Sequence, residues 1–84
     1  GSAWVVGGGT PIIALQELTG INLTADLPRA DVRTLSEWVA GHLGRPVRGG
    51  DLIQRNSLRV LVRKVRRQQV LEAQIIAPAG KEDG

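Results

Sequence analysis

The sequence has no cysteine, methionine, phenylalanine or tyrosine among its 84 residues, and only two tryptophans. Without cysteine it can form neither a disulfide framework, nor a thiolate nucleophile, nor the cysteine-rich zinc site that stabilises many small domains. With so few aromatic side chains, the core must consist of Leu, Ile and Val, and we expect Trp4 and Trp38 to anchor it. The longest apolar runs have four or five residues, far short of the ~20 that a membrane-spanning helix requires.

A capped helix is the clearest element that the sequence predicts. The Thr34 side chain can accept from the Glu37 N–H while the Glu37 side chain reaches back to the Thr34 N–H, an arrangement typical of a helix start. Gly44 can adopt the left-handed conformation that ends a helix. Between these positions, apolar residues recur at helical spacing and form one stripe: Leu35, Trp38, Val39 and Leu43.

Four strands and one more helix are indicated by shorter patterns. Residues 4–6 form an apolar strand, and a helix follows in which Thr10 is the cap, Pro11 takes the first helical position and Gly20 ends the element. Residues 51–54, 58–63 and 70–77 form three further strands, the middle one alternating apolar and polar positions. The order of elements predicts an α+β fold, a small antiparallel sheet with both helices on one face.

The two ends of the chain differ in composition from the rest. Residues 1–3 look like the remnant of a cleaved expression tag, and residues 78–84 are expected to form a disordered polar tail. The sequence therefore predicts one domain, residues 4–77, excised from a larger protein.

A glycine-rich segment is the candidate cofactor-binding site. Gly7, Gly8, Gly9 and Thr10 follow a strand and open a helix, and helix N-termini offer free N–H groups to phosphates. The segment matches neither the dinucleotide-binding glycine pattern nor the P-loop pattern, because the required glycine spacing and the lysine are missing. A plain flexible loop is the competing interpretation.

Basic side chains are concentrated in residues 45–67, where eight of them face a single acidic residue, Asp51, although the chain's net charge is only +3. The predicted partner-binding residues lie in the β-hairpin of this range: Arg55, Arg59, Arg63, Lys64, Arg66 and Arg67. Such a cluster attracts an acidic partner domain, an anionic lipid surface or a nucleic acid. Nucleic acid is disfavoured because these strands lack stacking aromatic residues. In the remaining interpretation the arginines only keep exposed strands from aggregating.

Residues with catalytic or metal-binding chemistry are few and scattered. His42 is the only histidine, and without a cysteine or paired carboxylates nearby it cannot assemble a catalytic centre or a metal site. Asp26, Asp31 and Asp51 could bind a divalent cation together, but their contexts are typical of caps and turns. We therefore expect neither catalytic residues nor a metal site.

Several segments follow one another in a recognisable order. An apolar strand with three glycines precedes P-I-I-A-L-Q-E-L-T-G at residues 11–20 and T-L-S-E-W-V-A-G-H-L-G at residues 34–44. They are followed by L-R-V-L-V at residues 58–62 and V-L-E-A-Q-I at residues 70–75. In this order and spacing the chain resembles the transporter-associated domain of the CorC/HlyC family. It departs from that family at Leu58, where an aromatic residue is usual, and at Arg45 and Pro46, which lack an intervening apolar residue.

The resemblance implies a fold similar to an FAD-binding-type α+β domain, without established catalytic residues. In that family the module follows a membrane domain and a pair of CBS domains, in bacterial proteins linked to magnesium and cobalt efflux or described as hemolysins. It thus implies a non-enzymatic regulatory domain on the cytoplasmic side of the bacterial inner membrane, which modulates ion transport through contacts with neighbouring CBS and membrane domains. An FAD-binding or adenine-nucleotide-binding module is the alternative, and homo-oligomerisation stays open.

Overall fold

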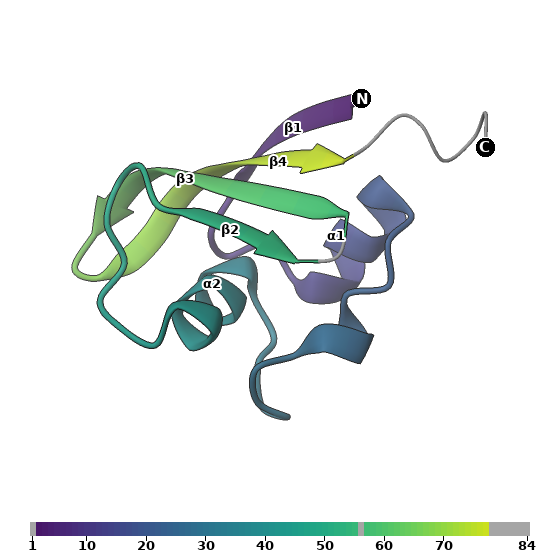
Figure 1. Cartoon of the computed structure of the whole chain (residues 1–84), viewed down its shortest axis with the longest axis horizontal. Coiled ribbons are helices and arrows are strands. Elements are labelled where there is room, and N and C mark those ends of the chain that lie inside the picture. The colour runs from purple at the N-terminus through teal and green to yellow at the C-terminus, as the bar shows by residue number, and fades with distance from the viewer. Residues whose placement is uncertain (1, 56, 78–84) are drawn as a thin grey trace.

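The first strand of the chain lies beside the last one in a sheet of order β1-β4-β3-β2, in which all neighbours are antiparallel (Figure 1). The computed structural model describes residues 2–55 and 57–77. Within them the elements are β1 (Ser2–Gly7), α1 (Ile12–Thr19), the 3-10 turn η1 (Thr24–Asp26), α2 (Leu35–Leu43), β2 (Leu52–Arg55), β3 (Leu58–Arg66) and β4 (Gln69–Ala77). Both helices lie on one side of the sheet, so the predicted α+β class is confirmed.

The β1–β4 pairing runs from Ser2 opposite Ala77 to Gly7 opposite Glu72. Ser2 and Ala3, which the sequence assigns to a tag remnant, are therefore placed in this strand. The predicted disordered tail, residues 78–84, lies outside the described residues. No helix in the described part of the chain is long and apolar enough to cross a bilayer.

Helix α1 begins differently from the sequence prediction. Its cap position is Pro11 and it lacks a side-chain cap, so the prediction that Thr10 caps the helix is wrong. The Ile12 N–H donates instead to the Arg33 carbonyl (2.8 Å), and the Leu35 N–H donates to the Thr10 carbonyl (2.9 Å). The Arg33 carbonyl thus satisfies the Ile12 N–H, one of the donors at the helix start that a side-chain cap would satisfy.

Helix α2 begins and ends as the sequence predicts. The Glu37 N–H donates to Thr34 Oγ1 (3.2 Å), and Glu37 Oε1 accepts from the Thr34 N–H (3.2 Å), which forms the predicted capping box. Gly44, with φ of 69°, ends the helix in the left-handed region, and Gly20 ends α1 in the same way with φ of 75°. Both helix ends are therefore set by residues next to them in sequence.

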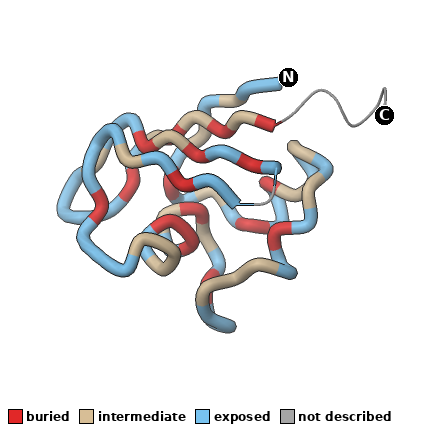
Figure 2. Tube along the Cα trace, in the orientation of Figure 1, coloured by how far each residue is buried: buried red, intermediate tan, exposed pale blue. Residues whose placement is uncertain are grey.

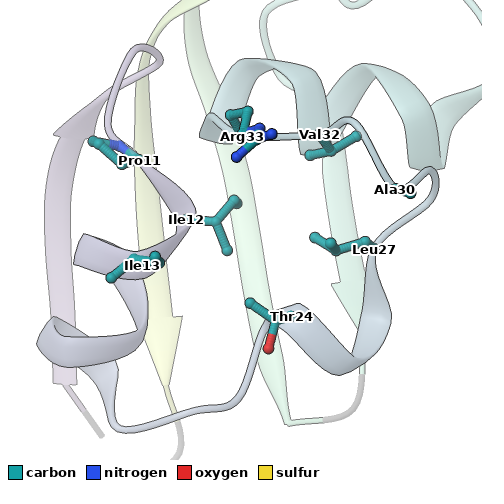
Figure 3. Close-up of a pocket in the computed structure, with 8 residues that line it drawn as sticks. All are labelled: Pro11, Ile12, Ile13, Thr24, Leu27, Ala30, Val32 and Arg33. Atoms are coloured by element: carbon teal, nitrogen blue, oxygen red, sulfur yellow. The ribbon is translucent and has the colours of Figure 1, made fainter.

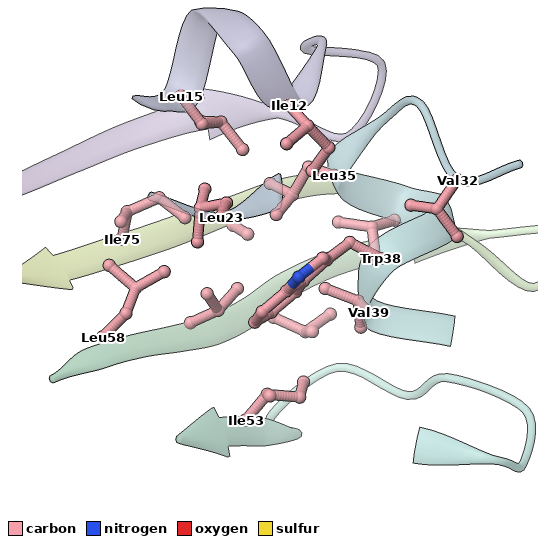
Figure 4. Close-up of a cluster of buried hydrophobic side chains, with 14 of the residues drawn as sticks. Ile12, Leu15, Leu23, Val32, Leu35, Trp38, Val39, Ile53, Leu58 and Ile75 are labelled. Atoms are coloured by element: carbon pink, nitrogen blue, oxygen red, sulfur yellow. The ribbon is translucent and has the colours of Figure 1, made fainter. Parts of the chain in front are cut away.

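The core lies between the helices and the sheet, where buried positions alternate with exposed ones along the strands (Figure 2). Trp38 is 1% exposed and lies between α2 and the strands (Figure 4). On β3 the buried residues are Leu58, Val60 and Val62, as the alternation predicts. No polar or charged side chain is buried in residues 2–55 and 57–77. Stability therefore rests on apolar burial, at about 1.5–3 kcal/mol for each large side chain.

Candidate interaction surface

An apolar row crosses the side of the sheet that faces away from the helices. Val5 of β1 lies opposite Gln74 of β4, and Gln74 lies opposite Leu61 of β3. Leu61 in turn lies opposite Leu52 of β2. Because directly paired residues project from the same face of a sheet, three apolar side chains and one amide form a line across all four strands. Val5 is 59% exposed and Leu52 53% exposed.

We call this surface the open face. It consists of Ala3, Val5, Leu52, Gln54, Arg59, Leu61, Arg63, Gln74 and Ile76. In the described part of the chain both helices lie on the opposite side of the sheet (Figure 1). An antiparallel sheet face that meets only water usually carries polar side chains, so the apolar row distinguishes the open face from an ordinary solvated one.

A register shift in the β3–β4 hairpin brings two cations to one carboxylate. This shift, between Val62 and Lys64, inserts an extra residue into β3, and a second shift between Lys64 and Val65 inserts one into β4. As a result Arg63 Nε lies 3.3 Å and Lys64 Nζ 3.8 Å from the carboxylate oxygens of Glu72. One acidic group thus faces two basic ones, and the local charge stays positive.

Three other predicted partner-binding residues carry no ion pair to a described residue. Arg59 is exposed on the open face, directly opposite Ile76 of β4 and Gln54 of β2. Arg66 closes β3, and Arg67 lies at the tip of the hairpin. Arg67 and Gln68 have φ of 53° and 65°, the left-handed region that a two-residue hairpin turn of type I′ requires and that favours Asn or Gly. A two-residue turn at Arg67 and Gln68 thus joins β3 to β4.

Arg55 is engaged elsewhere in the protein. Its Nε and Nη2 donate to the Asp26 carboxylate at 2.9 and 2.8 Å, which ties η1 to the end of β2. These hydrogen bonds hold the pKa of Asp26 below its ordinary value. The Asp26 carbonyl accepts from Trp38 Nε1 (3.2 Å) and lies 2.9 Å from His42 Nε2. Arg55 therefore has a structural role, in which it differs from the other predicted partner-binding residues.

The glycine-rich segment is bound closely to its neighbours. The Gly8 N–H donates to the Leu71 carbonyl (3.1 Å), and the Gly8 carbonyl accepts from the Ser36 N–H (2.8 Å). A Cβ atom at Gly8 would lie 1.7 Å from the Val70 carbonyl oxygen, so only glycine fits between β1 and β4. This close approach explains Gly8 by packing alone.

A cavity of about 270 Å³ adjoins this segment. It is lined by Gly8, Gly9, Thr34, Ser36, Glu37, Gln69 and Val70. The structure thus brings Gly8 and Gly9 next to Gln69 and Val70, which follow the tip of the β3–β4 hairpin, but the charged side chain of the lining is the Glu37 carboxylate. Glu37 repels a phosphate, because like charges at this range are unfavourable. Phosphate binding by Gly7, Gly8, Gly9 and Thr10 stays a prediction.

The three aspartates considered for a metal site lie apart, each beside an arginine. Asp31 pairs with Arg29, with 3.3 Å between Oδ1 and Nε. Asp51 accepts from Arg45 Nη2 (2.7 Å) and from the Arg48 N–H (2.8 Å), and these bonds lower its pKa. In residues 2–55 and 57–77 no three His, Cys, Asp or Glu side chains are grouped as metal ligands.

A second hollow lies between α1 and the segment before α2 (Figure 3). This groove has a volume of about 410 Å³ and is lined by Pro11, Ile12, Ile13, Thr24, Leu27, Ala30, Val32 and Arg33. Ile13, 64% exposed, lies in it. Neither the groove nor the apolar row was predicted from the sequence. The sequence did contain one sign of the row. Leu61 is an apolar residue at an outward position of the strand, between Arg59 and Arg63.

The fold and the open face define a small α+β domain with one covered and one uncovered sheet face. The family model described as "Transporter associated domain", CorC_HlyC, matches residues 1–78, so the chain belongs to that family. No curated protein matches it.

Solved structures with the same fold come from several bacteria. The CorC_HlyC transporter-associated domain from Nitrosomonas europaea is 17% identical, with a TM-score of 0.79 over 92% of this chain and 88% of that one. The corresponding domain of a Xylella fastidiosa hemolysin, in complex with Mg²⁺ and Mn²⁺, is 16% identical, with a TM-score of 0.75 over 90% and 87%. The associated region of a proposed Mg²⁺ and Co²⁺ transporter (CorC) from Neisseria meningitidis is 14% identical, with a TM-score of 0.77 over 90% and 89%. At these identities the likeness shows a shared fold.

Proposed function

We propose that this chain is a non-catalytic regulatory domain at the cytoplasmic C-terminus of a bacterial membrane protein that transports ions such as magnesium or cobalt. It modulates transport by contacts with neighbouring CBS and membrane domains of the same protein. Membership of the transporter-associated family and the likeness to the Neisseria region support this proposal. The observation that carries it is the open face, an exposed surface that combines an apolar row with Arg59 and Arg63.

The use of the polar groups inside the fold also supports a non-catalytic role. Asp26, Asp51 and Glu37 each accept hydrogen bonds from the chain itself, where they fix a turn, a loop and a helix start. His42 contacts the backbone of η1. These side chains thus serve the structure of the domain. A surface that binds another domain does not require any of these residues.

Transport assays on the parent protein test this function. Cells that express the parent with residues 1–84 deleted should differ from cells with the full-length parent in magnesium or cobalt efflux at equal protein level. The parent reading frame should also contain several apolar spans of ~20 residues upstream. Unchanged efflux, or a parent without such spans, would contradict the proposal.

The alternative, an adenine-nucleotide or FAD binder, rests on the cavity beside Gly8 and Gly9. A bound ligand stabilises the folded state by mass action, so saturating FAD or ATP should raise the Tm of the chain. Amide NMR shifts confined to residues 7–10 and 34–37 would support binding there. An unchanged Tm and spectrum would leave domain contacts as the function.

A further inference from the structure

We propose that the open face binds an amphipathic α-helix whose apolar stripe is flanked by Asp and Glu, supplied by a neighbouring domain of the parent protein. The inference rests on the proposed function and adds to it the binding surface and the chemistry of the partner.

The apolar row sets the position of the helix. Neighbouring strands lie about 4.8 Å apart, and successive turns of an α-helix lie about 5.4 Å apart. A helix laid along the row therefore places about one apolar residue of its stripe over each strand, above Val5, Leu61 and Leu52. Val5 and Leu52, which are half exposed in the chain alone, become buried in the complex, which favours binding.

Two arginines set the charge of the helix. Arg59 and Arg63 lie two residues before and two residues after Leu61 on β3, so they stand on both sides of the row. Their Cα atoms are at most about 13 Å apart, because β3 has its extra residue between Val62 and Lys64, and an α-helix with its side chains is about 10–12 Å wide. Arg59 can therefore reach a carboxylate along one edge of a helix that occupies the row. Arg63, whose Nε already pairs with Glu72, can reach one along the other edge only through its Nη groups. Arg59 has no carboxylate within ion-pair distance among the described residues, so its fork of donors is open to such a partner.

The same charges disfavour a second copy of the chain on this face. Two open faces in contact would bring the arginines of both copies together. Glu72, the acidic residue at its border, already pairs with Arg63 and Lys64 of its own chain. Like charges at an interface are unfavourable, so the occupant must carry the opposite charge.

A lipid surface fits the open face less well than a helix. Membrane-bound surfaces insert apolar and aromatic side chains into the interface. Trp38 is buried between α2 and the strands, and Trp4 packs against the core on the covered side of the sheet. The open face thus offers no aromatic side chain to anchor in a lipid interface.

A peptide titration tests the proposal on the 84-residue chain. The probe is a synthetic 18-residue helix with Leu at positions i, i+3, i+4 and i+7 and Glu beside them, and its counterpart carries Lys in place of Glu. Amide NMR shifts of the ¹⁵N-labelled chain should saturate with the Glu peptide at Val5, Arg59, Leu61 and Gln74. The Lys peptide should bind at least tenfold more weakly.

Two matched pairs of variants locate the site. Leu52→Ser should weaken binding of the Glu peptide at least fivefold, whereas Leu18→Ser, the same change at an exposed position of α1, should alter it less than twofold. Arg59→Glu should weaken it at least tenfold, whereas Arg48→Glu, an equal charge change at an exposed position between α2 and β2, should alter it less than threefold. Thermal unfolding of each variant verifies that the fold persists.

Several outcomes would overturn the proposal. These are equal affinity for both peptides, shifts that map to the groove of Figure 3, binding to vesicles of anionic lipid without binding to the Glu peptide, or self-association in sedimentation that Leu52→Ser abolishes. The titration does not depend on transport. Unchanged efflux after deletion of the domain would contradict the proposed function alone, and a peptide that does not bind would contradict the open-face proposal alone.

Discussion

Arg55 and Asp26, 29 residues apart in the chain, are joined by two hydrogen bonds, 2.9 Å from Nε to Oδ2 and 2.8 Å from Nη2 to Oδ1. The pair fixes η1 at the end of the sheet, where the Asp26 carbonyl also contacts Trp38 and His42. A residue predicted from charge density as a partner contact is thus part of the framework that orients the loop between the helices.

Removal of this pair should affect stability but not the open face. Asp26→Ala and Arg55→Ala should each lower the Tm, and the double variant should lower it by less than the sum, because either change alone breaks both hydrogen bonds. The carbonyl contacts of Asp26 persist in all three variants. Thermal unfolding in a double-mutant cycle measures the coupling, and strictly additive shifts in Tm would show that the two residues act independently.

The stability of the domain should fall in acid. Hydrogen bonds from Arg55 lower the pKa of Asp26, and those from Arg45 and the Arg48 N–H lower the pKa of Asp51, both below the ordinary 3.8. A carboxyl whose pKa is lower in the folded state stabilises the fold fully above its unfolded pKa and loses that effect as the pH falls through the folded pKa.

Urea unfolding between about pH 6 and pH 2 measures this dependence. The free energy of unfolding should stay level down to about pH 4 and then decline. In the Asp26→Asn, Asp51→Asn double variant the decline should be shallower, although stability at neutral pH is lower. If the free energy of unfolding of the double variant declined in acid as steeply as that of the unsubstituted chain, these two carboxyl groups would be excluded as the cause of the decline.

Trp38 should be the most costly side chain to truncate. It is 1% exposed and its Nε1 donates to the Asp26 carbonyl. Trp38→Ala should cost about 3–5 kcal/mol in the free energy of unfolding because it opens a cavity. Trp38→Phe keeps most of the ring but loses the hydrogen bond, so it should cost about 1–3 kcal/mol. Chemical denaturation followed by circular dichroism measures both, and native-like stability of Trp38→Ala would contradict the packing.

The neighbouring glycines Gly8 and Gly9 should respond differently to alanine. A Cβ at Gly8 would collide with the Val70 carbonyl, whereas a Cβ at Gly9 meets nothing within 4 Å. Gly8→Ala should therefore cost about 1–3 kcal/mol or more through forced backbone movement, and Gly9→Ala should change stability by less than about 0.5 kcal/mol.

The same pair distinguishes packing from ligand binding. If the glycine segment binds a nucleotide through its backbone, Gly9→Ala should weaken a shift in Tm caused by ATP or FAD without altering the Tm of the free chain. If glycine is required only for packing, the Gly9→Ala variant should behave like the unsubstituted chain in every assay. Comparable destabilisation by both substitutions would contradict the close approach at Gly8.

The elements of the fold were predictable where their determinants lie within a few residues. The capping box of Thr34 and Glu37, the left-handed Gly44 and the alternation along β3 each depend on neighbours in sequence. The helix start at Thr10 was predicted wrongly, because the Ile12 N–H donates to the Arg33 carbonyl, which only the tertiary fold brings there.

The candidate interaction surface was likewise predictable only in part. The sequence by itself determined the class of the fold, the ends of α2 and the concentration of positive charge in residues 45–67, since these follow from local propensity and composition. Only the tertiary structure decided that Arg55 turns to Asp26, that Gly8 packs on Val70 and that Val5, Leu61 and Leu52 align across the open face. Ion pairs, close contacts and strand register join segments far apart in the chain, and the energy that selects them arises only when the sheet has formed.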